Sequence, residues 1–208
     1  MTIKACLPKI GLGVCAVIFL LAGCRGPTSP IEFYTLTPLV GITEADKSAG
    51  LGNAVAVGVG PLQIPKLIDR PQIISREDVN RISVDEFHRW GGSLYEDFLI
   101  VLTLNLSELL GTNQVAAYPW EDYFDPDYRI YMEVHQFEGR LGEYAQLNIT
   151  WTITGRRPED VKRVQHSVIK EPVQSSGFDA FVAAKSRILS ALSRELAQAI
   201  IEIHGGKE

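Results

Sequence analysis

Alternation of apolar and polar residues is clearest in residues 144–154. One set of alternate positions in this segment is apolar, and the other set is polar: Ala145, Leu147, Ile149, Trp151 and Ile153 against Gln146, Asn148, Thr150, Thr152 and Thr154. This period of two predicts a strand with one buried face and one wet face. Residues 130–134 and 164–169 show weaker strand patterns on either side of it. We therefore expect three consecutive strands in an antiparallel meander.

Two other stretches carry apolar residues at helical spacing. The first starts at Ser93, which can cap a helix together with Glu96, and ends at Gly111; its apolar positions are Phe98, Val101, Leu102, Leu109 and Leu110. The second runs over residues 178–203, with Asp179 in the first turn; its apolar positions are Phe181, Ile188, Leu192, Leu196, Ala199 and Ile203. Two long helices are predicted.

The first half of the chain predicts the remaining elements. Residues 31–36 have strand composition, and residues 54–59 are nearly all apolar, as in a strand buried on both faces. Between them, residues 41–53 form a polar, glycine-rich loop. Two short amphipathic runs within residues 73–87 flank Asp78 to Asn80 and predict a hairpin.

These elements together predict an α+β fold. We expect one mainly antiparallel sheet with two long helices packed on it, in a single domain that spans residues 31–206. The composition agrees, since 46% hydrophobic and 22% charged residues are typical of a globular protein. No internal repeat and no second domain boundary is visible in the sequence.

The N-terminal 23 residues have the pattern of an export signal. Lys4 and Lys9 precede an apolar run over residues 10–21 that is too short to span a bilayer core of about 30 Å. The run ends in Leu21-Ala22-Gly23-Cys24, which resembles a bacterial lipobox. The resemblance implies cleavage before Cys24, a diacylglycerol thioether on its sulfur and an N-acyl chain, which leaves residues 24–30 as a lipidated tether. The alternative is a plain signal-anchor helix with a chance cysteine.

Processing at this motif changes the cysteine count and the charge. Cys6 and Cys15 are lost, and the sulfur of Cys24 is acylated, so no disulfide is expected. Lys4 and Lys9 are lost as well, so 18 of the 20 basic residues remain in the mature chain, together with all 25 acidic ones. The net charge therefore changes from -5 to -7. This charge excludes the broad electrostatic attraction that a nucleic-acid-binding protein uses.

Catalytic and metal-binding patterns are not found in the sequence. No histidine pair has the i, i+4 spacing of a metal site, and no G-x-S-x-G motif or free thiol remains in the mature chain. Residues 121–127 contain four carboxylates but lack the glycine and spacing of an EF-hand loop, so a solvated loop is the preferred interpretation. We expect a protein that is not an enzyme, with no cofactor other than its acyl chains.

Several short sequence motifs, called the family phrases below, resemble those of one protein family in their order and spacing. They are Phe33-Tyr34-Thr35-Leu36, residues 62–73, Arg89-Trp90, Tyr118-Pro119-Trp120 and the final helix that begins near Phe178. With them the chain resembles the ABC-type transport auxiliary lipoproteins, the PqiC-like family. The resemblance implies a non-catalytic, homo-oligomeric subunit that works with a mammalian-cell-entry (MCE) domain protein and its membrane partners to move lipid between bacterial membranes. Arg25, where inner-membrane lipoproteins usually have Asp, indicates the outer membrane.

One phrase contains the candidate interface, formed by Pro65, Leu67, Asp69, Arg70 and Gln72. The alternative interpretation is an irregular crossing over the core, since the two prolines in this phrase exclude helix at their own positions. Trp90 and Trp120 are interpreted as core or loop-anchoring residues.

Two other functions remain open from the sequence. The protein could assist the assembly of an outer-membrane protein, or it could be a periplasmic hydrolase that uses Asp122, Asp125 or Asp127.

Overall fold

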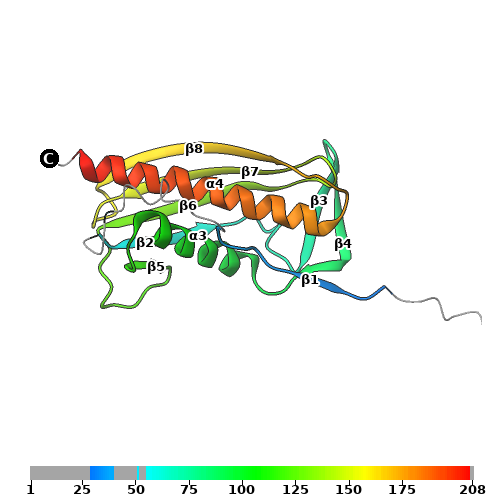
Figure 1. Ribbon diagram of the computed structural model, residues 1–208, viewed down its shortest axis with the longest axis horizontal. Helices are drawn as coiled ribbons and strands as arrows, with labels where there is room; N and C mark the ends of the chain where they lie inside the picture. Colours follow the sequence, from blue (N-terminus) through cyan, green and yellow to red (C-terminus); the bar gives the residue numbers. More distant parts are fainter. Residues whose placement is uncertain (1–28, 40–50, 52–54, 207–208) are drawn as a thin grey trace, which may run out of the picture. The chain divides into compact units, whose positions relative to one another are not determined.

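A computed structural model describes residues 29–39, 51 and 55–206 of the chain. The predicted signal peptide, the lipobox with Cys24 and most of the predicted loop at residues 41–53 lie outside these residues. Two compact units are distinguished, Met1–Pro30 and Ile31–Glu208, and the fold is that of the second (Figure 1). Its elements are β1 (Glu32–Tyr34), β2 (Val57–Gln63), β3 (Gln72–Asp78), β4 (Arg81–Trp90), α3 (Leu94–Leu110), β5 (Val115–Ala117), β6 (Tyr128–Arg140), β7 (Tyr144–Thr154), β8 (Val161–Pro172) and α4 (Phe178–Gly205).

The described strands form two sheets, ordered β5-β2-β6-β7-β8 and β1-β4-β3. The predicted meander is confirmed, because β6, β7 and β8 pair antiparallel in sequence order. The predicted hairpin is also confirmed as the antiparallel pair of β3 and β4. An α+β fold in a single domain is therefore correct.

The prediction of one mainly antiparallel sheet is wrong, because both sheets are mixed. β2 runs parallel to its neighbours β5 and β6, and β1 runs parallel to β4. Each of these parallel pairs is joined by a long connection that contains other elements, not by a hairpin. The hydrophobic pattern of a strand records which face is buried but not the direction of its partner, so the sequence pattern could not reveal the mixture.

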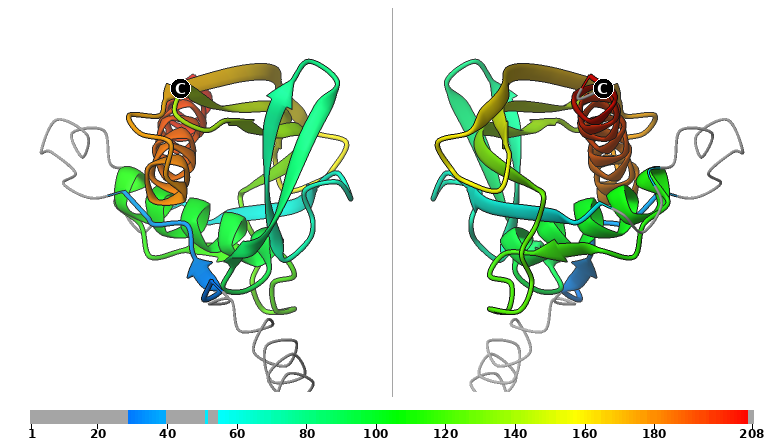
Figure 2. Two further views of the ribbon diagram at one scale, coloured as in Figure 1. Left: turned by 90° about the vertical axis from the view of Figure 1, so that its right-hand side faces the viewer. Right: turned by 90° about the vertical axis from the view of Figure 1, so that its left-hand side faces the viewer.

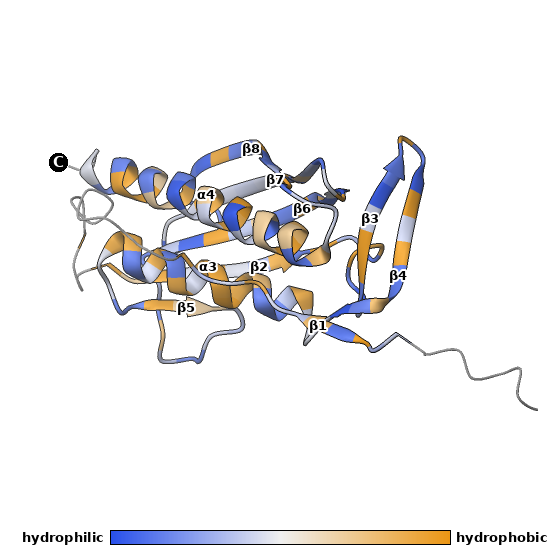
Figure 3. Ribbon diagram, turned by 45° about the vertical axis from the view of Figure 1, so that its right-hand side comes forward, coloured by the Kyte–Doolittle hydropathy of each residue, from blue (hydrophilic) through white to orange (hydrophobic). Residues whose placement is uncertain are grey.

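Both helices lie against the five-stranded sheet and against each other. α3 packs near β2 and β5, and α4 packs along β7 and β8 (Figures 1 and 2). The predicted cap of α3 is present: the Glu96 amide donates to Ser93 Oγ at 3.4 Å, and Gly111 ends the helix in the left-handed region at φ 62°. Each helix carries apolar residues beside polar ones (Figure 3), as expected for a helix with one buried face.

The core lies between the helices and the sheet. Trp151, at the centre of β7, is 1% exposed, and the other apolar residues of its alternating set are also buried. The polar set of β7 is more exposed, except for the buried Thr154, so the predicted faces of this strand are correct. The largest other fully buried rings are Tyr128, Phe98, Phe137 and Phe181.

Two charged side chains are buried near one end of this core. Glu138 on β6 pairs with Arg76 on β3 at 2.5 Å, and its other oxygen accepts from the Phe137 amide at 3.1 Å. Lys185 on α4 donates to the Phe137 carbonyl oxygen at 2.5 Å. Its Nζ also lies 4.2 Å from the centre of the Phe137 ring and 5.1 Å from that of Phe181. The end of β6 thus holds both the β3–β4 hairpin and the final helix.

Candidate interaction surface

Four of the five phrases that carry the family resemblance lie at the three-stranded sheet, whereas Tyr118-Pro119-Trp120 packs on β2 of the other sheet. Tyr34 on β1 lies in register with Trp90 on β4. The Gly91 amide donates to the Tyr34 carbonyl at 2.7 Å, and the Trp90 amide donates to the Pro71 carbonyl at 2.7 Å. Segments separated by 19 and by 57 residues in sequence are therefore joined by backbone hydrogen bonds in the fold.

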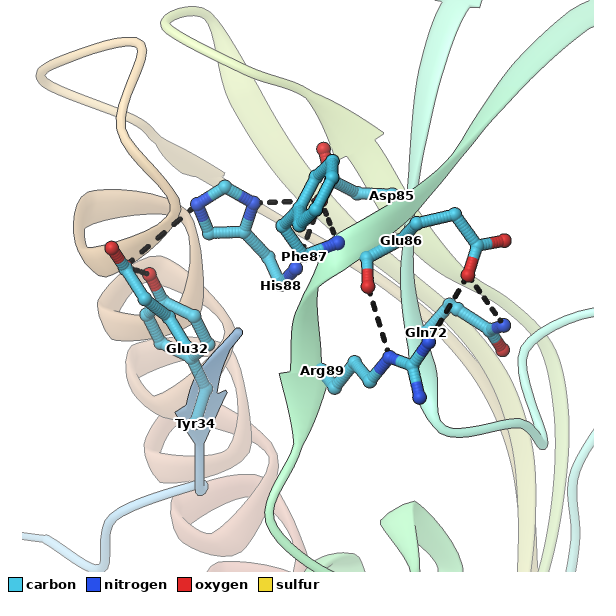
Figure 4. A network of polar contacts seen from close by, with 8 residues as sticks. All are labelled: Glu32, Tyr34, Gln72, Asp85, Glu86, Phe87, His88 and Arg89. Carbon is cyan, nitrogen blue, oxygen red and sulfur yellow. Dashed lines mark hydrogen bonds and ion pairs between the residues drawn. The ribbon is translucent and has the colours of Figure 1, made fainter. Parts of the chain in front are cut away.

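A polar network fixes the junction of β1 and β4 (Figure 4). His88 Nδ1 lies 2.7 Å from Asp85 Oδ1, and its Nε2 lies 3.8 Å from Glu32 Oε2. The Tyr34 hydroxyl donates to the same Glu32 oxygen at 2.6 Å. The imidazole also stacks on Phe178, with ring centres 4.0 Å apart. The first residue of α4 is thereby joined to the small sheet.

Two of these side chains have shifted pKa values. Burial, followed by the hydrogen bond to Glu32, raises the pKa of Tyr34. Partial burial alone would raise the pKa of Asp85, but hydrogen bonds from the His88 side chain and from the Phe87 and His88 amides outweigh it and hold that pKa below its usual value. Tyr34 is therefore a stable hydrogen-bond donor, and Asp85 is a stable acceptor.

The other side of β4 carries a second, more exposed network (Figure 4). Arg89 donates to the Glu86 carbonyl at 3.0 Å and to its carboxylate at 3.1 Å. Gln72, a predicted interface residue, lies in register with Arg89 and donates to Glu86 Oε2 at 3.4 Å. No motif in the sequence singles out Glu32, Asp85 and Glu86, although the positions of Glu32 and Glu86 next to or near family phrases are a signal for them.

The predicted interface phrase is a turn with one buried and several exposed residues. The Pro65 carbonyl accepts from the amides of Ile68 at 3.0 Å and Asp69 at 3.1 Å. Ile68 is 4% exposed and belongs to the core, as the alternative interpretation expects, whereas Leu67 is 43% exposed. The exposed Asp69 and Arg70 form no ion pair with any residue that the structure describes. Their role in an interface remains a prediction.

A groove of about 340 Å³ adjoins this phrase. It is lined by Gln63, Ile64, Pro65, Glu133, Val134 and His135. Beside it, on the face of the sheet turned away from α4, His135 Nε2 lies 2.9 Å and His166 Nδ1 3.3 Å from the Thr150 hydroxyl. Within the described ranges no group of three or more potential metal ligands is found.

The acidic run at residues 121–127 is largely tied to neighbouring groups. Asp127 pairs with Arg156 at 2.7 Å and accepts from the Ala56 amide at 3.0 Å. Asp125 pairs with Arg129 at 3.3 Å. Two of the three carboxylates considered for hydrolysis thus stabilise the loop.

Both tryptophans of the family phrases have structural positions. Trp90 is 4% exposed and belongs to the core. Trp120 covers Gly58 so closely that a Cβ at that position would lie 2.7 Å from the indole ring. Its ring also meets Tyr118 edge-on, with centres 5.5 Å apart. The interpretation of these residues as core and loop anchors is confirmed.

Comparison with protein families decides the identity of the chain. The model of the ABC-type transport auxiliary lipoprotein component matches residues 34–197, which include all of the described strands after β1 and most of α4. The chain belongs to this family. It is therefore an auxiliary lipoprotein of ABC-type transport, a lipid-anchored protein of the cell envelope.

Solved structures show the same fold. A crystal structure of a Xanthomonas campestris protein aligns with a TM-score of 0.69 at 17% identity, covering 85% of this chain and 99% of that one. A second, described only as an uncharacterized protein, aligns with a TM-score of 0.68 at 16% identity, covering 83% and 99%. A comparison with curated proteins finds no match. In the described part of this family member, no helix is long and apolar enough to cross a membrane.

Proposed function

We propose that this auxiliary lipoprotein is the outer-membrane subunit of an MCE-type intermembrane lipid transport system. Acyl chains on Cys24 hold it to the membrane, and its domain docks the component that crosses the envelope. The family match supports the transport role, and Arg25 after the lipidated cysteine supports the outer membrane. The seven residue steps from Cys24 to Ile31 reach at most about 25 Å, so a partner must cross the rest of the envelope.

The packing of the domain favours docking over carrying lipid. The space between sheet and helices is filled by large side chains, among them Trp151, Phe98 and Phe181. The exposed Leu67, Asp69 and Arg70 instead offer apolar and charged groups on the surface. We assign these three residues, with Pro65 and Gln72, to the contact with the MCE protein or with a neighbouring copy of the subunit.

Replacement of Cys24 by serine tests the anchor. Without the thiol, no thioether forms, so the Cys24→Ser protein is expected to remain an uncleaved or unlipidated precursor that does not float with outer membranes. Density-gradient flotation and the mass of the protein measure this. Cys15→Ser is the matched control, because Cys15 lies in the predicted signal and its loss leaves the mature chain unchanged. Normal processing and sorting of Cys24→Ser would disprove the anchor.

Charge reversal at Asp69 tests the docking surface. Asp69→Arg places a positive charge beside Arg70 and is expected to weaken association with the MCE protein or between copies, without lowering stability, because Asp69 is exposed. Sedimentation of the detergent-solubilised mature protein, alone and mixed with the periplasmic part of the MCE protein, measures it. Asp122→Arg is the matched control, because it makes the same charge change at another exposed position.

The same experiment separates the proposed function from its alternative. A mature protein that stays monomeric and does not bind the MCE protein at tens of micromolar would overturn the docking role. Recovery of an outer-membrane barrel without any MCE protein from the membranes would then favour a role in outer-membrane protein assembly.

A further inference from the structure

Three exposed apolar residues lie around the strand that follows the membrane tether. Phe33 is 67% exposed, Ile31 46% and Phe87 41%. Phe33 lies on β1, and Phe87 lies on the paired strand β4, two residues before the register partner of Phe33. We call Ile31, Phe33 and Phe87 the β1 patch. Exposed apolar side chains that gather on one face can mark a surface that another molecule covers.

We infer that the β1 patch lies on the surface of the bilayer that holds the acyl chains, with Phe33 in the region between headgroups and hydrocarbon. The inference rests on the proposed lipidation of Cys24. The inferred orientation goes beyond lipidation, because an acyl anchor holds the domain near the membrane without selecting which face of the domain contacts it.

The alternation of β1 explains why Phe33 is exposed. Its two neighbours, Glu32 and Tyr34, point together into the network around His88, so the side chain between them must point to the opposite face of the strand. The network thus fixes the face of β1 that carries Phe33, and on this face the side chain is 67% exposed.

The length of the tether favours the bilayer as the occupant. Nine residue steps separate Phe33 from Cys24, so its α-carbon lies at most about 32 Å from that of the lipidated residue. Other exposed apolar residues, such as Val79 at 77% and Tyr123 at 88%, are not attached to the anchor by such a short piece of chain. Among the exposed large apolar side chains that the structure describes, Ile31 and Phe33 are therefore the ones that the tether keeps nearest to the membrane, and β1–β4 pairing brings Phe87 beside them.

Of the two charged side chains paired beside the patch, Arg89 is the one that suits phospholipid headgroups, whereas Glu86 does not. Arg89 lies in register with Phe33, and its side chain is 32% exposed in a pair with the more exposed Glu86. An arginine next to an aromatic ring is a common arrangement at membrane interfaces, where the ring enters the apolar region and the guanidinium stays with the phosphates. The acyl chains supply the affinity for the membrane, and the patch selects the orientation of the domain.

The test uses a fluorescent label at position 33 of the full mature protein. Cys24 is acylated and is the only cysteine of the mature chain, so a cysteine introduced by Phe33→Cys is the single site for an environment-sensitive label. The lipidated protein is placed in vesicles of phosphatidylethanolamine and phosphatidylglycerol. Val79→Cys is the matched control, because Val79, at 77% against 67% for Phe33, is similarly exposed but lies at the β3–β4 turn. Both side chains are exposed, so neither substitution removes a core contact.

The label at position 33 is expected to be quenched severalfold more strongly by spin-labelled lipid than the label at position 79, and less strongly by aqueous iodide. Equal quenching at the two positions would overturn the inference. A label at position 33 that is shielded from iodide but not quenched by lipid would also overturn it, and would show that a second copy of the chain covers the patch. Protein that does not float with the vesicles would overturn the anchor itself, whereas floating protein with position 33 in water overturns only the orientation.

Discussion

Replacement of Trp151 by alanine is expected to lower the free energy of unfolding by about 3–5 kcal/mol. The indole is 1% exposed at the centre of β7, so its removal leaves a large cavity between sheet and helices. Its N–H also donates to the Ser167 hydroxyl at 3.1 Å, and Ser167 donates to Glu195 on α4 at 2.6 Å. The substitution therefore also disturbs a hydrogen-bonded connection from the sheet to α4.

Urea unfolding of the two variants Trp151→Ala and Thr150→Ala measures this effect. Thr150 is the neighbouring residue on the opposite face of β7, and its contacts with His135 and His166 are exposed to solvent. Its replacement is expected to change the free energy of unfolding by less than about 1 kcal/mol. Equal losses for the two variants would show that the two faces of β7 are wrongly assigned.

The free energy of unfolding is also expected to rise with pH between about 7 and 10 because of Lys185. Burial lowers the pKa of this lysine to about 7 in the folded protein, although the nearby Glu138 carboxylate opposes the shift. In the unfolded chain the pKa of a lysine is about 10.4. Between these values the unfolded chain holds a proton that the folded protein has released, so stability increases by up to about 1.4 kcal/mol per pH unit. The loss of stability caused by burying Lys185 is complete below the pKa of this lysine in the folded protein and absent above its pKa in the unfolded chain.

Lys185→Met isolates this contribution, because methionine fills similar space without a titrating group. Unfolding in urea at several pH values from 7 to 10 is expected to show that the wild-type protein gains stability relative to Lys185→Met by several kcal/mol across the range. Lys66→Met, at an exposed position, should leave the pH dependence as it is in the wild type. A pH dependence that is the same in Lys185→Met as in the wild type would show that Lys185 does not cause it.

Local patterns in the sequence were sufficient for the elements that depend on their own residues. The alternation in residues 144–154 identified β7 and its buried face, and Ser93 and Gly111 identified the ends of α3. The short strand β5 was missed, because three residues are too few to show a period. The strand predicted over residues 54–59 corresponds to the first part of β2, which runs over Val57–Gln63, and residue 54 lies outside the described residues.

The candidate surface was only partly accessible to the same reasoning. The phrase at residues 62–73 was recognised, but its division into a buried Ile68 and an exposed Leu67 depends on which side of the turn meets the core. The exposure of Phe33 likewise depends on the network that holds Glu32 and Tyr34 on the other side of β1.

The two helices, the meander and the hairpin can be predicted from the sequence, because caps, turns and hydrophobic periods act over a few residues, and the family can be predicted from the order and spacing of its motifs. The parallel pairing of β1 and β2 with distant strands, and the burial of Lys185 beside Phe137 and Glu138, become visible in the tertiary structure alone. These features depend on contacts between segments dozens of residues apart. Such contacts are selected by the packing of the whole core, which no local pattern records.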